Sequence, residues 1–133
     1  MYSNGKKNRG ELAKAELALE EAETKHQLIK SRLEERRAER EALDNLVERA
    51  GAAGNVDELI ILQSRRSAMD KTLMDLSISE KECLHRVESA RRYIYKLYIR
   101  LEKLRQEAAG LEEDEPRQLV RVRMQIEAIA GAE

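Results

Sequence analysis

Hydrophobic residues between positions 59 and 111 recur alternately every three and every four residues. The sixteen positions of this seam are Leu59, Leu62, Arg66, Met69, Leu73, Leu76, Glu80, Cys83, Val87, Ala90, Ile94, Leu97, Leu101, Leu104, Ala108 and Leu111. A 3,4 spacing that persists this long is typical of the contact stripe of a left-handed coiled coil. The spacing predicts one helix over residues 56–113, roughly 85 Å long at ~1.5 Å per residue, and therefore an elongated particle.

A second seam with the same spacing lies earlier in the chain and predicts a helix over residues 11–50. Its positions are Leu12, Ala15, Leu19, Ala22, His26, Ile29, Leu33, Arg36, Arg40, Leu43, Val47 and Ala50. The segment GAAGN, residues 51–55, predicts the turn that follows: Gly51 can take the left-handed conformation that ends a helix. Asn55 is a good N-cap for the next helix, with Glu58 three residues later as its capping-box partner. Because the connection is short, we expect the two helices to be antiparallel.

A third, shorter helix is predicted after the segment EEDEPRQ. Pro116 suits the first turn of a helix, and apolar residues then recur with 3,4,3 spacing through residues 117–130, at Leu119, Val122, Ile126 and Ile129. The second helix exceeds the first by about eighteen residues, since 58 residues face 40. The unpaired seam positions are Leu97, Leu101, Leu104, Ala108 and Leu111. We expect the third helix to fold back over them.

The predicted fold is therefore all-α, a long antiparallel coiled-coil hairpin with a third helix on the end of the longer one, assembling into a bundle. The predicted segments are a flexible basic arm at residues 1–10, the hairpin at 11–113 and the C-terminal helix at 114–133. The basic residues of the arm are Lys6, Lys7 and Arg9.

Composition narrows the class of protein. Charged residues make up 38% of the 133 residues, yet the net charge is −1, which does not indicate a dedicated polyanion binder. Cys83 is the single cysteine, so a disulfide scaffold is excluded. No apolar run approaches the ~20 residues that a membrane span needs, and no apolar stretch follows the basic N-terminus as in a signal peptide. We expect a cytoplasmic protein without a membrane partner.

Catalytic or metal chemistry is not expected. A narrow helical pair offers no water-excluding pocket, and the chain has no nucleophile motif and no phosphate-binding glycine loop, so we predict neither an enzyme nor a cofactor. The candidates for a metal site would be His26, Glu80, Cys83 and His85, with Glu82 at Glu-x-x-His spacing to His85. We interpret His26 instead as a polar seam residue beside Glu80, and Cys83 as a small buried side chain.

The stretch RRYIYKLYIR, residues 91–100, is the strongest candidate for a binding surface. It holds three of the four tyrosines, and the candidate partner-binding residues in it are Arg91, Arg92, Tyr95, Lys96, Tyr98 and Arg100. Tyr and Arg are common at the energetic centres of interfaces. The alternative interpretation is structural: Tyr93 and Tyr98 flank the seam and would seal the place where the three helices meet, while Tyr95 points outward.

Nucleic acid is the rival partner. Residues 85–105 carry seven Lys and Arg against two Glu, and the N-terminal arm would add Lys6, Lys7 and Arg9 close in space. Lys and Arg can contact phosphates, and tyrosines among them can stack on bases. The first helix, however, has eleven acidic residues against eight basic ones and could neutralise this charge.

The charged seam positions suggest a partner as well. Arg40 and Arg66 fall at one level of the antiparallel pair and would repel each other unless Glu39, Asp70 or a second chain supplied a carboxylate. A single hairpin also buries little surface, so we expect self-association, most simply as a dimer. The predicted function is that of a protein-binding module, an adaptor, scaffold, stalk or inhibitor that docks its helical surface to a larger protein.

Overall fold

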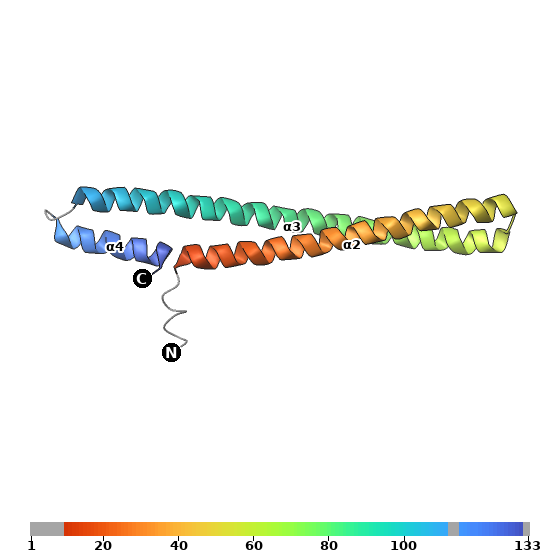
Figure 1. Ribbon diagram of the computed structural model, residues 1–133, viewed down its shortest axis with the longest axis horizontal. Coiled ribbons are helices and arrows are strands. Elements are labelled where there is room, and N and C mark those ends of the chain that lie inside the picture. The colour runs from red at the N-terminus through yellow and green to blue at the C-terminus, as the bar shows by residue number, and fades with distance from the viewer. Residues whose placement is uncertain (1–9, 112–114, 132–133) are drawn as a thin grey trace, which may run out of the picture. The chain divides into compact units, whose positions relative to one another are not determined.

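A computed structural model describes residues 10–111 and 115–131 of the chain. These residues form helices α2 (Glu11–Ala53), α3 (Val56–Leu111) and α4 (Pro116–Ala130), and the described ranges contain no strand (Figure 1). The all-α fold, the antiparallel hairpin and the returning third helix are thus confirmed. The basic arm, apart from Gly10, lies outside the described residues, as do positions 112–114, where the second helix was expected to end.

The chain divides into two units. One, called here the hairpin unit, is the continuous segment Glu23–His85. The other, called here the terminal unit, combines the residues up to Ala22 with those from Arg86 onward. Helices α2 and α3 contribute to both units, whereas α4 belongs to the terminal unit.

The turn between α2 and α3 corrects the sequence interpretation. Gly51 remains helical, α2 continues to Ala53, and it is Gly54 that takes the left-handed conformation, with φ of 70°. The Asn55 N–H then donates to the Ala50 carbonyl at 3.0 Å, and the Gly54 N–H donates to the Gly51 carbonyl at 3.2 Å. This pair of bonds is a Schellman motif, which satisfies two carbonyls of the last helical turn and requires the left-handed residue to follow the helix rather than lie within it.

The start of α3 agrees with the prediction. The Glu58 N–H donates to Asn55 Oδ1 at 3.3 Å, and the Asn55 side-chain amide donates to Glu58 Oε2 at 3.0 Å. Asn55 is therefore an N-cap, although Glu58 bonds the side chain of Asn55 and not its backbone N–H, as a strict capping box would require.

Burial along α3 confirms the predicted seam. All sixteen seam positions are buried or half-buried, including the charged Arg66 and Glu80. On α2 eleven of the twelve predicted positions are buried or half-buried as well. Arg36 is the exception: its side chain turns outward, 46% exposed, and donates two 2.9 Å hydrogen bonds to Glu39, one turn along the same helix.

The terminal unit contains the hydrophobic core cluster. Its buried members are Ala15 of α2, Leu97, Leu101 and Leu104 of α3, and Val122 and Ile129 of α4. Leu12, Ile94, Ala108, Leu111 and Ile126 pack against them. Helix α4 therefore covers the part of α3 that α2 does not reach, as the unpaired seam positions predicted.

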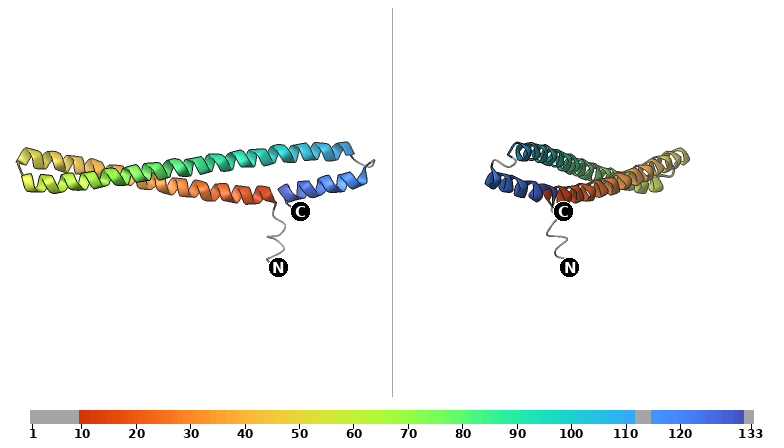
Figure 2. Two further views of the ribbon diagram at one scale, coloured as in Figure 1. Left: turned by 180° about the vertical axis from the view of Figure 1, so that it is seen from behind. Right: turned by 60° about the vertical axis from the view of Figure 1, so that its left-hand side comes forward.

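Gly10 departs from the prediction that residues 1–10 form a flexible arm. It is buried, and its carbonyl accepts the first backbone hydrogen bond of α2, from Lys14 N–H at 3.3 Å. A Cβ placed on Gly10 would clash with backbone atoms of Ile129 and Gly131 at the end of α4. Figure 2 shows the first residues of α2 meeting the last residues of α4, both alongside α3. The missing side chain is what permits this approach.

Candidate protein-binding surface

Residues 91–100 lie within α3, in the part that belongs to the terminal unit. All six predicted partner-binding residues, Arg91, Arg92, Tyr95, Lys96, Tyr98 and Arg100, are exposed. Of the three tyrosines that the structure describes, Tyr95 is the most exposed at 67%, and Tyr93 and Tyr98 are each 50% exposed. Ile94 and Leu97 pack in the core, and the remaining side chains of this stretch are exposed.

Tyr98 connects two helices. Its hydroxyl donates a hydrogen bond of 3.1 Å to Glu16 Oε1 on α2. The hydrogen bond to the Glu16 carboxylate, together with its negative charge, raises the pKa of Tyr98 above its usual value of 10.0, because both favour the protonated phenol. Tyr98 therefore links α3 to α2, whereas Tyr95 makes no hydrogen bond within the described residues.

The outward face of α3 contains an apolar residue that the binding prediction omitted. Ile99 is 39% exposed and lies four residues after Tyr95, which places both on the same side of the helix. Arg92 lies three residues before Tyr95 and donates a 3.3 Å hydrogen bond to Ser89. Lys96 lies four residues after Arg92. The resulting surface, called here the outward patch, consists of Arg92, Tyr95, Lys96 and Ile99. The spacing of Tyr95 and Ile99 alone could have revealed it.

In the hairpin unit, the seam residues His26 and Glu80 lie next to each other, as predicted. His26 Nε2 lies 3.1 Å from Glu80 Oε1, and both side chains are largely covered, at 18% and 23% exposure. Cys83 is buried, as expected for a small apolar side chain. Within the described residues no three His, Cys, Asp or Glu side chains gather in a way that could hold a metal ion.

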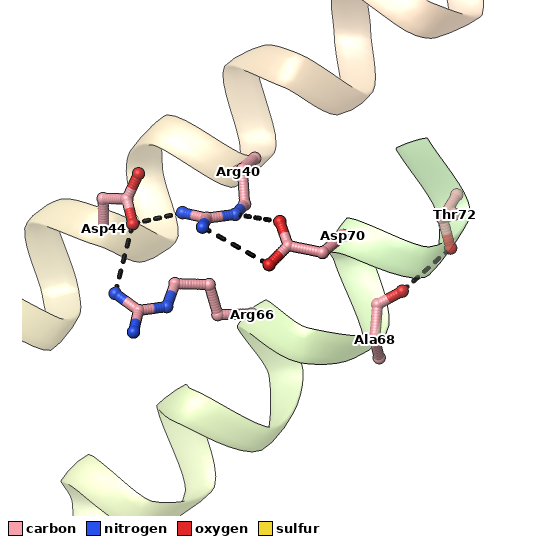
Figure 3. Close-up of polar contacts among 6 residues, drawn as sticks. All are labelled: Arg40, Asp44, Arg66, Ala68, Asp70 and Thr72. Carbon is pink, nitrogen blue, oxygen red and sulfur yellow. Dashed lines mark hydrogen bonds and ion pairs between the residues drawn. The ribbon is translucent and has the colours of Figure 1, made fainter. Parts of the chain in front are cut away.

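Carboxylates of the same chain neutralise the seam residues Arg40 and Arg66 (Figure 3). Arg40 Nε donates to Asp70 Oδ1 at 2.5 Å, and Arg40 Nη1 donates to Asp44. Arg66 Nη1 reaches the same Asp44 oxygen at 3.3 Å. The guanidinium of Arg40 lowers the pKa of Asp70 below its usual 3.8, and the carboxylates raise the pKa of Arg40 in return.

This network removes one argument for a partner. Asp70 was anticipated as a source of countercharge, but Asp44 was missed because its contact with Arg66 depends on the register of the two helices. Glu39 pairs with Arg36 instead. The charges of Arg40 and Arg66 therefore give no reason to expect a second chain.

None of the helices described for this chain has an apolar stretch of the length that crosses a lipid bilayer. Comparison of the sequence and the structure with protein-family models, curated proteins and solved structures finds no match. The surface itself is therefore the basis for a functional proposal.

Proposed function

We propose that this chain is a non-enzymatic protein-binding module, an adaptor, scaffold, stalk or inhibitor, that docks its helical surface at residues 91–100 to a larger protein. The observation that carries the proposal is the outward patch: Tyr95 and Ile99 are exposed together, next to Arg92 and Lys96, and neither belongs to the hydrophobic core cluster. An aromatic ring and an aliphatic side chain that the fold does not need, placed among cations, have the composition of an interface centre.

The outward patch also favours a protein over nucleic acid. Glu88 and Glu102 lie seven residues before and seven residues after Tyr95, on the same side of α3, and both are exposed. A phosphate backbone that followed this face would meet a carboxylate at each end of the patch. Ile99, moreover, offers apolar contact and no charge.

Photo-crosslinking captures a partner of any identity and so tests the proposal directly. A photoreactive phenylalanine analogue replaces Tyr95 in cells of the organism that encodes the chain. The matched control carries it at Gln27, an exposed polar position on α2 in the hairpin unit. We expect a discrete protein adduct from position 95 and none from position 27.

Two variants then distinguish residues that bind the partner from residues that stabilise the fold. Arg92→Ala with Tyr95→Ala should weaken the captured complex by ~2 kcal/mol or more while melting stays nearly unchanged. Tyr98→Ala should mainly lower the melting temperature, because it removes the contact with Glu16. An adduct at position 95 that nuclease digests would establish the nucleic-acid alternative in place of this proposal, and equal adducts at both positions would refute it.

Self-association is part of the proposal and concerns the hairpin unit. Its buried apolar residues are Leu33, Ala50, Leu62 and Cys83, while Val56, Ile60, Ile61, Met74 and Ile78 are each more than half exposed. A two-helix unit with so small a core is stabilised when a second copy covers its apolar flank. Light scattering coupled to size-exclusion chromatography should give the mass of a dimer, and a monomer at micromolar concentration would contradict it.

The proposed location is the cytoplasm. It is supported by the single thiol of Cys83, which is buried and needs no oxidising compartment. Fractionation of cells that produce the tagged chain tests this placement.

A further inference from the structure

A groove in the terminal unit lies beside the outward patch. It has a volume of about 340 Å³ and is lined by Glu11, Lys14, Ala15 and Ala18 of α2 and by Ala90 and Tyr93 of α3. Its walls are mostly apolar. The half-exposed ring of Tyr93 forms one of them, and in the described part of the chain its hydroxyl makes no hydrogen bond. The space is large enough for more than one large aliphatic side chain.

The α3 flank of this groove is cationic. Arg86, Tyr93 and Arg100 are spaced seven residues apart and so project from one side of the helix. Lys96 follows Tyr93 by three residues on the neighbouring position. All three cations are exposed, and no carboxylate of the described chain pairs with them.

The α2 flank does not offset this charge. Glu11 and Lys14 cancel each other, and Glu21, three residues after Ala18, adds one carboxylate. The groove therefore has an apolar floor with a surplus of positive charge along one edge.

We infer that this groove binds an acidic amphipathic helix of the partner protein, with apolar side chains seated against Ala18 and Tyr93 and carboxylates paired with Arg86, Lys96 and Arg100. The inference rests on the proposed function and names the chemistry of the partner. The partner's helix would cover Ala15, Ala18 and Ala90 by side-chain packing of the kind that stabilises helical bundles.

The same charges disfavour the other occupants. A second copy of the chain related by a two-fold axis would bring an identical cationic edge to this site. A nucleic acid would satisfy the cations but would leave the apolar floor next to phosphate and sugar, and the cations line one edge only.

A pair of synthetic helical peptides tests the inference on the full chain. Both have about three heptads with Leu at the seam positions; one carries Glu at the flanking positions and the other Lys. We expect fluorescence anisotropy to detect binding of the Glu peptide and not of the Lys peptide. A labelled single-stranded RNA serves as the third probe, and tighter binding of the RNA than of the Glu peptide would overturn the inference.

Filling the groove gives the decisive variant. Ala18→Leu places a side chain in the hollow without removing a contact, and Ala13→Leu makes the same exchange at an exposed position of α2 that does not line it. Ala18→Leu should weaken binding of the Glu peptide by about tenfold or more, while Ala13→Leu leaves it unchanged. Arg100→Glu should weaken it as well. Equal affinities for the two leucine variants would refute the groove as the binding site.

Failure of this inference can be told apart from failure of the proposed function. If photo-crosslinking at position 95 captures the same protein from Ala18→Leu and from the unaltered chain, the binding module stands and the groove does not. If position 95 captures no protein, the proposed function itself fails, whatever the peptides do.

Discussion

Replacing Gly10 with alanine tests the packing of α4 directly. The added Cβ would clash with the carbonyl group of Ile129 and with the N–H nitrogen of Gly131, all of which are backbone atoms. No flexible side chain can move aside, so either the two helix ends shift apart or α4 leaves α3.

The magnitudes decide between these responses. Release of α4 would expose Val122 and Ile129, which are 5% and 3% exposed in the structure, and would cost about 1.5–3 kcal/mol for each side chain. Moving the two helix ends apart to accommodate the added Cβ typically costs ~1–3 kcal/mol in total. The shift is the cheaper response, so Gly10→Ala should lower the free energy of unfolding by ~1–3 kcal/mol while α4 stays attached.

Gly110→Ala is the matched control. Gly110 is helical, and a Cβ there would meet no atom within 4 Å. The same exchange should therefore raise the free energy of unfolding by up to about 1 kcal/mol, because alanine favours the helix over glycine.

Urea denaturation followed by circular dichroism measures both changes, and hydrogen exchange of the α4 amides reports whether α4 remains docked. Faster exchange confined to the last turn of α4 would agree with the shift. If Gly10→Ala were as stable as Gly110→Ala, the close approach of the α2 and α4 ends would be wrong.

Four further predictions concern other parts of the molecule. Gly54→Ala should destabilise the chain by about 1–2 kcal/mol because residue 54 is left-handed, whereas Gly51→Ala should stabilise it by up to about 1 kcal/mol; urea denaturation giving the reverse order would contradict the observed turn. Because its ion pair lowers the pKa of Asp70 below the unfolded value of 3.8, the stabilisation is present above that pH and is lost as pH falls through the folded pKa. Asp70→Asn should therefore be less stable than the unaltered chain at neutral pH and should lose less stability on acidification, as thermal melts at a series of pH values would measure. The raised pKa of Tyr98 should fall toward 10.0 in Glu16→Gln, which ultraviolet titration of the phenols detects as earlier ionisation; an unchanged curve would exclude the contact. The elongated particle that the seam spacing predicts is checked by small-angle scattering, where the maximum dimension of a globule of this mass would contradict it.

Much of the fold follows from local sequence patterns. The 3,4 spacing identifies the buried positions of α3 because every seam residue contributes to the same stripe, and two charged interruptions do not change its phase. Asn55 and Glu58 mark a helix start because an N-cap acts over three residues. The level of His26 and Glu80 follows from counting both helices outward from the turn.

Contacts between distant residues decided the remainder. Gly51 and Gly54 have equal intrinsic freedom, and the choice between them depends on which one lets the Asn55 N–H reach the Ala50 carbonyl. From the sequence, Gly10 is predicted to be part of a flexible arm. Its burial depends on the end of α4, which lies more than a hundred residues later in the sequence and packs against it.

The candidate binding surface divides in the same way. The exposure of Tyr95 follows from helical spacing alone, since it lies outside the seam. The link between Tyr98 and Glu16, the countercharge that Asp44 supplies to Arg66 and the groove beside Tyr93 exist only once α2 and α3 are in register. Helical periodicity determines which side of a helix a residue occupies, but what that residue touches depends on the packing of the helices against one another.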